Sequence, residues 1–305
     1  MILVTGSTGF VGSHLVKRLV KAGHKVRALA RDEKSAAGLR VKGVEVFIGD
    51  VTKPDSLEHA ADGCEAVIHL VGIIQPGPGY SFLSIHNNGT QNIIDEAKRA
   101  GTVKHFIYQS ALGTRKGAVS EYHKTKYIAE ELTKGSGLNY TITRPSIIYG
   151  EGDGFTARLT DVIKLSPVVP VIGTGKGLLQ PIYIDDLVNV FTKVVLNPAY
   201  YGRTIELGGP EQLTFDEIMD ELKEALGVTR PTVHFPVGLV RPVACVMERV
   251  LPHPPVTNDQ LTMLEEDNVC TMEALEELGI KPVRFHEGLK KFLTGTPADS
   301  HKAAA

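Results

Sequence analysis

The sequence predicts an α/β fold: a doubly wound parallel sheet followed by a small, mostly helical C-terminal lobe. Short apolar runs rich in β-branched residues alternate with helical patterns over residues 1–150. A glycine turn joins the first run to the first helix, and the regular alternation stops after Gly150. Because parallel strands need crossover helices and crossovers are right-handed, this order favours a sheet with helices on both faces.

The first element is a strand at 2–5 that leads into a glycine turn. Gly6, Gly9 and Gly12 follow at intervals of three, and an apolar helical pattern runs over 11–19. Gly6 permits the turn, Gly9 lets a pyrophosphate approach the backbone, and Gly12 lets the helix pack close to the strand. A helix N-terminus attracts anions, so the turn predicts a Rossmann-like dinucleotide site. The spacing GxxGxxG differs from the standard GxGxxG, and a purely structural turn is the alternative.

The later elements continue this alternation and then break it. Five further strands are expected, at 25–30, 44–48, 66–70, 105–109 and 140–143, with helical patterns at 81–99 and 122–134. A helix at 185–196 and a strand near 204–207 return to the sheet, and short helices follow, the first at 214–226. The expected domains are a dinucleotide-binding core at 1–150 completed by about 182–207, a substrate or partner lobe at 151–181 and 208–294, and a flexible tail at 295–305.

Composition and charge exclude several classes of function. The formal net charge of -2 provides no basic footprint, so we expect no nucleic-acid partner. Cys64, Cys245 and Cys270 are scattered without metal spacing, which predicts no metal and ordinary thiols in a reducing cytosol. No apolar run is long enough to span a bilayer, so we expect a cytoplasmic protein, with peripheral membrane contact left open.

The end of the second strand bears on the choice between NAD(H) and NADP(H). Ala30 occupies the slot where an acidic residue would hold the ribose 2′-OH of NAD(H), and Arg31 follows. The planar guanidinium suits a 2′-phosphate, so the sequence favours NADP(H) over NAD(H). Asp32 beside it complicates this interpretation, and a solvent-facing arginine without a ligand is the alternative.

The next two strand ends supply further candidate contacts. Asp50 could accept from the adenine amino group while Val51 packs on the ring; the alternative for Asp50 is a helix cap, for which Thr52 is the better candidate. Small and apolar residues would lie under the nicotinamide ribose at Leu70, Val71 and Gly72. His69, in an apolar run, is expected to be a hydrogen-bonded core histidine.

The catalytic prediction rests on Ser110, Tyr122 and Lys126. Tyr122 and Lys126 are four residues apart and share a helix face, while Ser110 ends the fifth strand. A phenol is a poor base at neutral pH because its ordinary pKa is near 10. A neighbouring ammonium, together with oxidised nicotinamide, would lower that pKa, and Ser110 would hold a substrate oxygen.

These motifs resemble an extended or atypical short-chain dehydrogenase/reductase of the epimerase/dehydratase kind, over about 1–207. A narrower likeness is to the bacterial relatives of the NAD(P)-binding accessory subunit of mitochondrial complex I. The broad resemblance rests on GSTGFVG, Gly49-Asp50-Val51, His69-Leu70-Val71-Gly72, Asn88-Gly89-Thr90, the Ser110, Tyr122 and Lys126 set and Arg144-Pro145. The narrower one rests on Ser110-Ala111-Leu112-Gly113, Arg144 to Gly150, Asp153-Gly154-Phe155, and Leu165-Ser166-Pro167 through Gln180-Pro181-Ile182-Tyr183.

The resemblance implies tightly held NADP(H) and catalysis by Ser110, Tyr122 and Lys126. The contacts it implies are Gly6, Thr8, Gly9, Phe10, Val11, Arg31, Asp50, Leu70, Tyr122, Lys126 and Pro145, to which we add Val51, Val71, Gly72, His86 and Ile148. One departure stands out. His86 occupies a slot that usually holds an asparagine of a proton relay, so either it shuttles a proton through water or it caps local backbone.

The lobe supports several interpretations. Arg158, Gln180 and Tyr183 fall where related enzymes close over a substrate, although a salt bridge or packing would explain each. We expect the apolar segment 237–251 to be a helix packed in the lobe; a pocket for an apolar substrate and a membrane-facing or partner-facing helix are the alternatives. The chain is therefore expected to be an oxidoreductase acting on a small molecule. An epimerase or dehydratase using the same site, or a non-catalytic cofactor-holding protein with a protein partner, remains the alternative.

Overall fold

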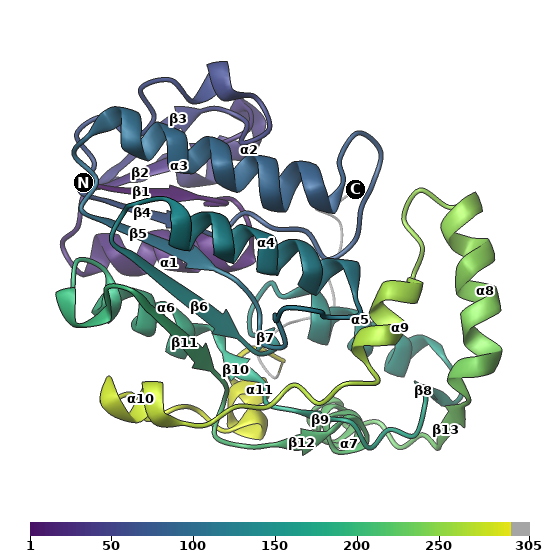
Figure 1. Cartoon of the computed structure of the whole chain (residues 1–305). Coiled ribbons are helices and arrows are strands. Elements are labelled where there is room, and N and C mark those ends of the chain that lie inside the picture. The colour runs from purple at the N-terminus through teal and green to yellow at the C-terminus, as the bar shows by residue number, and fades with distance from the viewer. Residues whose placement is uncertain (294–305) are drawn as a thin grey trace.

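A computed structural model gives the structure of the protein and describes residues 1–293 (Figure 1). The expected tail at 295–305 lies outside the described residues. All neighbouring strands of the central seven-stranded sheet are parallel, in the order β11-β6-β5-β4-β1-β2-β3. The doubly wound α/β prediction is therefore confirmed. These strands are β1 (Ile2–Thr5), β2 (Val26–Ala30), β3 (Val44–Ile48), β4 (Ala66–His69), β5 (His105–Gln109), β6 (Tyr140–Pro145) and β11 (Arg203–Leu207).

Helices cover both faces of the sheet because its strands are apolar on both sides. Successive residues of β1 point to opposite faces: Ile2 and Val4 join one core cluster and Leu3 joins the other. Figure 1 shows α3 and α4 over one face and α1 with α6 over the other. These four helices are α1 (Phe10–Lys21), α3 (Gly89–Ala100), α4 (Glu121–Gly135) and α6 (Ile184–Val194); α2 (Glu33–Ala36) is a short helix after β2.

The C-terminal lobe combines six helices with three two-stranded sheets. The helices are α5 (Gly154–Leu165), α7 (Phe215–Leu226), α8 (Val237–Val250), α9 (Asn258–Met263), α10 (Glu273–Glu277) and α11 (Phe285–Leu293). The small sheets pair β7 (Ile148–Tyr149) with β10 (Ile182–Tyr183), β8 (Val169–Ile172) with β13 (Thr232–Phe235), and β9 (Leu178–Leu179) with β12 (Leu213–Thr214). Helix α7 begins after Thr214 because Thr214 and Glu217 form a capping box there.

Helix α8 corrects one expectation. The sequence favoured a helix packed in the lobe, but only Ala244 of α8 is buried. Figure 1 places α8 at the outer edge of the molecule, beside α9. The apolar side chains of its outer face are exposed to solvent, while two ionic side chains reach other residues of the lobe: Arg241 pairs with Glu265, and Glu248 binds Asn258. The exposed apolar residues recur every three or four positions, at Leu239, Val243, Val246 and Val250, and form what we call the α8 stripe. Within residues 1–293, none of the helices combines the length and the apolar character needed to cross a membrane.

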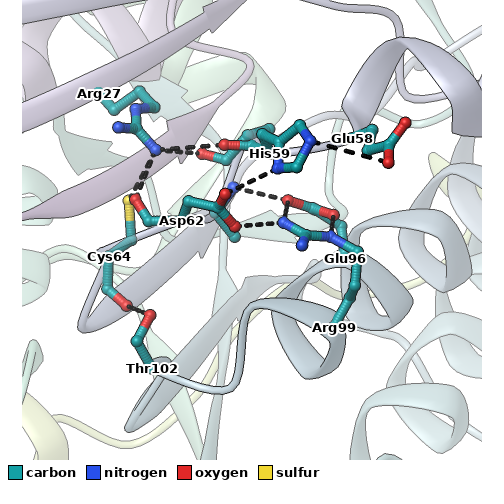
Figure 2. Close-up of polar contacts among 10 residues, drawn as sticks. Arg27, Glu58, His59, Asp62, Cys64, Glu96, Arg99 and Thr102 are labelled. Carbon is teal, nitrogen blue, oxygen red and sulfur yellow. Dashed lines mark hydrogen bonds and ion pairs between the residues drawn. The ribbon is translucent and has the colours of Figure 1, made fainter.

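A polar network holds the connection between β3 and β4, at the amino-terminal end of β4 (Figure 2). Nη1 of Arg27, on β2, donates to the carbonyl oxygens of Ala60 at 2.9 Å and Asp62 at 2.8 Å. Arg99 on α3 bridges the carboxylates of Asp62 and Glu96. Because a buried carbonyl oxygen without a donor is costly, Arg27 stabilises an otherwise irregular segment.

Candidate active site

Most of the expected site residues lie at the carboxyl edge of the sheet. Each of the first six strands ends at this edge, and the strand order reverses between β1 and β4. Ligands of doubly wound sheets bind outside such a switch point. The glycine turn follows β1 and Gly72 follows β4, so both flank it.

The glycine turn has little room for side chains. Gly6 has a φ of 69°, which favours glycine, and a Cβ on Gly12 would lie 2.1 Å from the Gly6 carbonyl oxygen. Helix α1 starts at Phe10 with no side-chain cap and no acidic residue in its first turn. Thr8 and Gly9 are exposed, Phe10 is half-buried, and Val11 is buried. The first turn of α1 therefore combines a positive dipole end with backbone that an anion can approach, which fits a pyrophosphate.

Arg31 and Asp32, which follow β2, differ in their contacts. The Asp32 carboxylate accepts from the Ser35 backbone N–H at 2.7 Å and so caps α2. This contact holds the pKa of Asp32 below its ordinary value. The Arg31 side chain is exposed and makes no ion pair within the described part of the chain. Asp32 therefore has a structural role of its own and does not neutralise Arg31 through a salt bridge.

Asp50 and Val51 follow β3, and neither Asp50 nor Thr52 caps a helix. Asp50 Oδ1 accepts from the backbone N–H and the hydroxyl of Thr52. The next helical turn begins at Pro54 after Lys53, which provides no side-chain cap. The cap alternative was therefore wrong, because the polar contacts close into a local turn. Val51 is buried, and a Cβ on Gly89 would lie 3.0 Å from it.

The end of β4 carries the expected small and apolar residues. Leu70 and Val71 are half-buried, and Gly72 is exposed. His69 is fully buried, with Nδ1 2.6 Å from the Thr5 hydroxyl and Nε2 3.1 Å from the Thr90 hydroxyl. Burial lowers its pKa to about 3, so it is a neutral core histidine, as the sequence predicted.

His86 is bonded on both sides of its ring. It lies in a π-helical turn over Leu83–Asn88 that precedes α3. Nε2 accepts from the Ile73 backbone N–H at 3.1 Å, and Nδ1 lies 2.9 Å from the Thr125 hydroxyl. Burial, reinforced by the Lys126 charge, lowers its pKa to about 2. Of the two roles considered, the contacts match backbone capping, because the protein already uses both ring nitrogens.

Tyr122 and Lys126 occupy the first and second turns of α4. The Tyr122 ring lies 5.5 Å from the His86 ring, edge to face. Lys126 is buried; its Nζ donates to the Gln109 carbonyl oxygen at 2.8 Å and lies 4.9 Å from the centre of the Tyr108 ring. Ser110 is also buried, and its hydroxyl donates to Thr114 at 3.3 Å.

The electrostatics differ from the expected arrangement. Burial raises the pKa of Tyr122 to about 12 and lowers the pKa of Lys126 to about 7. The expected lowering of the Tyr122 pKa by Lys126 is therefore absent in this structure, because desolvation is the dominant effect on both groups. A protonated phenol beside a lysine with a near-neutral pKa favours proton donation over proton abstraction.

The remaining candidates divide between the site and the lobe. Pro145 ends β6, and its carbonyl oxygen accepts from Leu112; Ile148 starts β7 and is half-buried. Gln180 is buried and bridges Gly209 and Cys270, so packing explains it. Tyr183 is buried against Tyr149, whereas Arg158 is exposed on α5.

The structure adds functional candidates that sequence reasoning missed. Asn87 is buried and donates to the Thr125 carbonyl oxygen at 2.8 Å, which links the π-helical turn to α4. Asp259, on α9, accepts from the backbone N–H groups of Glu121 and Tyr122. Asn87 adjoins His86 in the sequence and could have been considered with it. Asp259 had no such signal, because 137 positions separate it from Tyr122.

Comparisons with known proteins agree with this geometry. The chain matches a family model described as NAD(P)H-binding over residues 6–164. Ceramide reductase of Caulobacter vibrioides is 32% identical over 186 residues, which cover 61% of this chain and 58% of that protein. The 40 kDa subunit of mitochondrial NADH-ubiquinone oxidoreductase from Neurospora crassa is 26% identical over 288 residues, covering 92% of this chain and 75% of that protein.

A solved structure extends the likeness to the whole fold. UDP-glucose 4-epimerase from Thermotoga maritima, in complex with UDP-glucose, superposes with a TM-score of 0.74 at 22% identity. The superposition covers 96% of this chain and 97% of that one. At this identity the likeness establishes the shared fold, which joins the sheet and the C-terminal lobe in one arrangement.

Proposed function

The chain belongs to the NAD(P)H-binding family, and from that premise we propose that it is an NADP(H)-dependent oxidoreductase of the short-chain dehydrogenase/reductase type. One observation carries the proposal: the convergence of α4 and the π-helical turn on Gly72 at the switch point. A Cβ on Gly72 would lie 3.2 Å from Lys126 Nζ and 3.6 Å from His86 Nε2. The end of β4 also lies against the glycine turn before α1, since a Cβ on Gly6 would lie 3.1 Å from the Val71 backbone nitrogen. A pyrophosphate would bind at that turn.

The proposed roles follow from the protonation states. A bound nicotinamide would supply or accept the hydride. Tyr122, with a pKa of about 12, stays protonated near neutral pH and would donate its proton to the oxygen of a carbonyl under reduction. Lys126 would stabilise the phenolate left behind, and the Ser110 hydroxyl would orient the substrate oxygen. We therefore propose carbonyl reduction as the reaction to test first.

The preference for NADP(H) is part of the same proposal. Arg31 follows β2, is exposed, and makes no salt bridge or side-chain hydrogen bond among residues 1–293; it acts on Asp32 only through its charge, while the Asp32 carboxylate caps α2. A planar guanidinium without a salt bridge suits a 2′-phosphate. The remaining proposed cofactor contacts are Gly6, Thr8, Gly9, Phe10, Val11, Asp50, Val51, Leu70, Val71, Gly72, His86, Tyr122, Lys126, Pro145 and Ile148.

We also propose an apolar substrate and contact with a membrane surface on the cytoplasmic side. The α8 stripe is the supporting observation, since Leu239 is 69% and Val250 is 72% exposed. Arg249 adds a cation near the end of the helix without a salt-bridge partner in the described chain. An apolar face flanked by a basic residue is typical of helices that lie in a lipid interface. One relative is a ceramide reductase, and ceramide is itself a lipid.

A second candidate function is a cofactor-holding structural or assembly protein. The likeness over 92% of the chain to a subunit of a respiratory complex favours it, as does the bonded state of His86. In that case the nucleotide stabilises the fold by binding and need not turn over. An epimerase or dehydratase with the same site is compatible with the shared fold.

The first experiment identifies the bound nucleotide. The protein is purified without added nucleotide and denatured, and the released material is identified by mass spectrometry and absorbance. Near-stoichiometric NADP(H) supports both the dinucleotide site and the structural candidate. A protein that binds NADPH reversibly supports the exchanging enzyme, whereas failure to bind either dinucleotide refutes the proposal.

Two variants then separate binding from chemistry. Arg31→Ala should weaken NADPH binding by about tenfold or more while leaving NADH binding nearly unchanged, because one charge-assisted contact is lost. Lys42→Ala, which removes another exposed cation outside the proposed site, is the control. Tyr122→Phe should abolish carbonyl reduction and preserve NADPH affinity. Equal losses for the two dinucleotides contradict the role of Arg31, and retained turnover contradicts the role of Tyr122.

A further inference from the structure

The proposed catalytic residue Tyr122 lies in the first turn of α4, where backbone N–H groups need partners from outside the helix. Ser120 caps the helix by accepting from the His123 backbone N–H at 3.1 Å. Ser120 does not bind the backbone N–H groups of Glu121 and Tyr122. These groups also have no partner within the helix, because the first N–H groups of a helix never do. Tyr122 is the second residue of α4, so its backbone belongs to the turn that frays most readily.

A carboxylate from the C-terminal lobe binds both of these N–H groups. Asp259 Oδ1 accepts from the Glu121 N–H at 2.6 Å, and Oδ2 accepts from the Tyr122 N–H at 3.1 Å. Asp259 lies in the first turn of α9, which Figure 1 shows beside the start of α4. The negative carboxylate also complements the positive end of the α4 dipole.

Asp259 is itself held in place. Thr257 and Gln260 form a capping box at the start of α9, and Glu248 on α8 binds the backbone N–H of Asn258 at 2.8 Å. The carboxylate is therefore presented by a fixed turn and not by a free loop.

Two residues of the lobe that follow α9, Glu266 and Asn268, make further contacts with the core. Arg115, in the loop between β5 and α4, makes a bidentate ion pair with Glu266. Asn268 Nδ2 donates to the Leu112 carbonyl oxygen at 3.0 Å, and its Oδ1 accepts from Ser146 at 2.6 Å. The loop that leads from Ser110 to Tyr122 is thus attached to the lobe at both ends.

We propose that Asp259 is a positioning residue for Tyr122, and that it makes the placement of the phenol depend on the docking of α9. The catalytic part of this inference rests on the proposed function. Its structural part does not, because the two hydrogen bonds exist whether or not the site turns over. A misplacement of about 1 Å at a reacting group can reduce a rate by about a hundredfold, so anchoring the first turn of α4 has a catalytic consequence.

The test compares Asp259→Ala and Asp259→Asn with Asp267→Ala. Asp267 is a matched control because its carboxylate also caps a backbone N–H, that of Leu178, but does not contact α4. Asp259→Asn preserves the side-chain volume and one acceptor, so it remains informative if the alanine variant folds poorly.

The primary readout is amide hydrogen exchange at Glu121 and Tyr122, with the ¹³Cζ resonance of the Tyr122 ring, assigned through Tyr122→Phe, as the second. Asp259→Ala should accelerate exchange at both amides by about tenfold, the scale of a lost cap, and shift the ring resonance. Asp259→Asn should give a smaller effect, and Asp267→Ala none at these positions. Unchanged exchange in Asp259→Ala, or equal acceleration in Asp267→Ala, overturns the inference.

Nucleotide binding and kinetics distinguish this inference from the proposed function. NADPH affinity should change by less than about threefold in Asp259→Asn, because most of the proposed cofactor contacts, including those of the α1 turn, lie outside α4. In a carbonyl reduction assay, kcat should fall by about tenfold or more with little change in KM. A fall in NADPH affinity with unchanged kcat would overturn the positioning role. If the wild-type protein neither binds NADPH nor turns over, the proposed function fails, and the exchange data still decide whether Asp259 anchors Tyr122.

Discussion

Replacing Lys126 with methionine should stabilise the nucleotide-free protein while removing a group needed for catalysis. Burial lowers the pKa of Lys126 from 10.5 to about 7. At about 1.4 kcal/mol for each tenfold change, that difference corresponds to roughly 5 kcal/mol disfavouring the charged form. Met fills a similar volume but leaves the Gln109 carbonyl oxygen without its donor, which costs about 1–3 kcal/mol. We therefore expect a net gain of about 2–4 kcal/mol in the free energy of unfolding near neutral pH.

The stability difference between Lys126→Met and the wild type should depend on pH. Below about pH 7 Lys126 is protonated in both the folded and the unfolded protein, so the folded protein bears the full cost of burying the charged ammonium. Between about pH 7 and 10.5 the unfolded protein binds more protons, so the wild type gains stability as the pH rises. The advantage of Lys126→Met should consequently shrink over that range.

Urea unfolding of both proteins, from about pH 6 to pH 9.5, measures this difference directly. Lys124→Met is the control on the same helix, because Lys124 is exposed and pairs with Glu121. A stability difference that does not change with pH, or a less stable Lys126→Met variant at the lowest pH, would refute the assignment of a strained buried cation.

Three more predictions concern packing and polar contacts. Arg27→Met should lower the free energy of unfolding by about 1–3 kcal/mol, because two carbonyl oxygens lose their donor. Arg40→Met, which removes only an exposed ion pair, should have an effect of less than about 0.5 kcal/mol in the same urea titration. Gly12→Ala should abolish NADPH binding measured by fluorescence, since the new methyl group would lie 2.1 Å from a backbone oxygen, whereas Gly38→Ala, with open space around it, should bind normally. His86→Asn should lower the thermal midpoint and give no gain in turnover, because the shorter side chain does not reach the Ile73 backbone N–H that donates to His86 Nε2. A rate above that of the wild type would instead support a missing proton relay.

Much of the sheet could be predicted because its strands are short, apolar and separated by regular helical patterns. The strands at 2–5, 44–48 and 105–109 match β1, β3 and β5 residue for residue, and the others differ by one or two residues at an end. The residues that follow these strands meet at one edge, since parallel strands all run in the same direction. Their side-chain environment was less accessible: the Tyr122 and Lys126 spacing was evident, but the burial that sets both pKa values arises from distant elements.

The failures have identifiable physical causes. The π-helical turn at Leu83–Asn88 shares its apolar spacing with an α-helix over a few residues, so the pattern did not reveal it. In α8 the apolar residues predicted the helix correctly, but apolar composition does not indicate which side of a helix faces the protein and which faces the solvent. Contacts such as those of Asp259 depend on how the lobe folds back on the core, which no local pattern encodes.

The position of β11 in the sheet has a consequence for the order in which the chain is synthesised. Every proposed nucleotide contact has been synthesised by residue 148. However, β11 completes the edge of the sheet beside β6, and α6 covers α1 through contacts that include Arg18 with Asn189. At about 5–20 residues per second, the ribosome needs roughly 3–12 s to add the roughly 60 residues between Gly150 and the end of β11. During that interval the nascent nucleotide site has an open strand edge and a bare apolar helix face. A fragment ending near residue 150 would keep both exposed surfaces permanently, so truncation there should yield an aggregating chain and not an isolated nucleotide-binding domain.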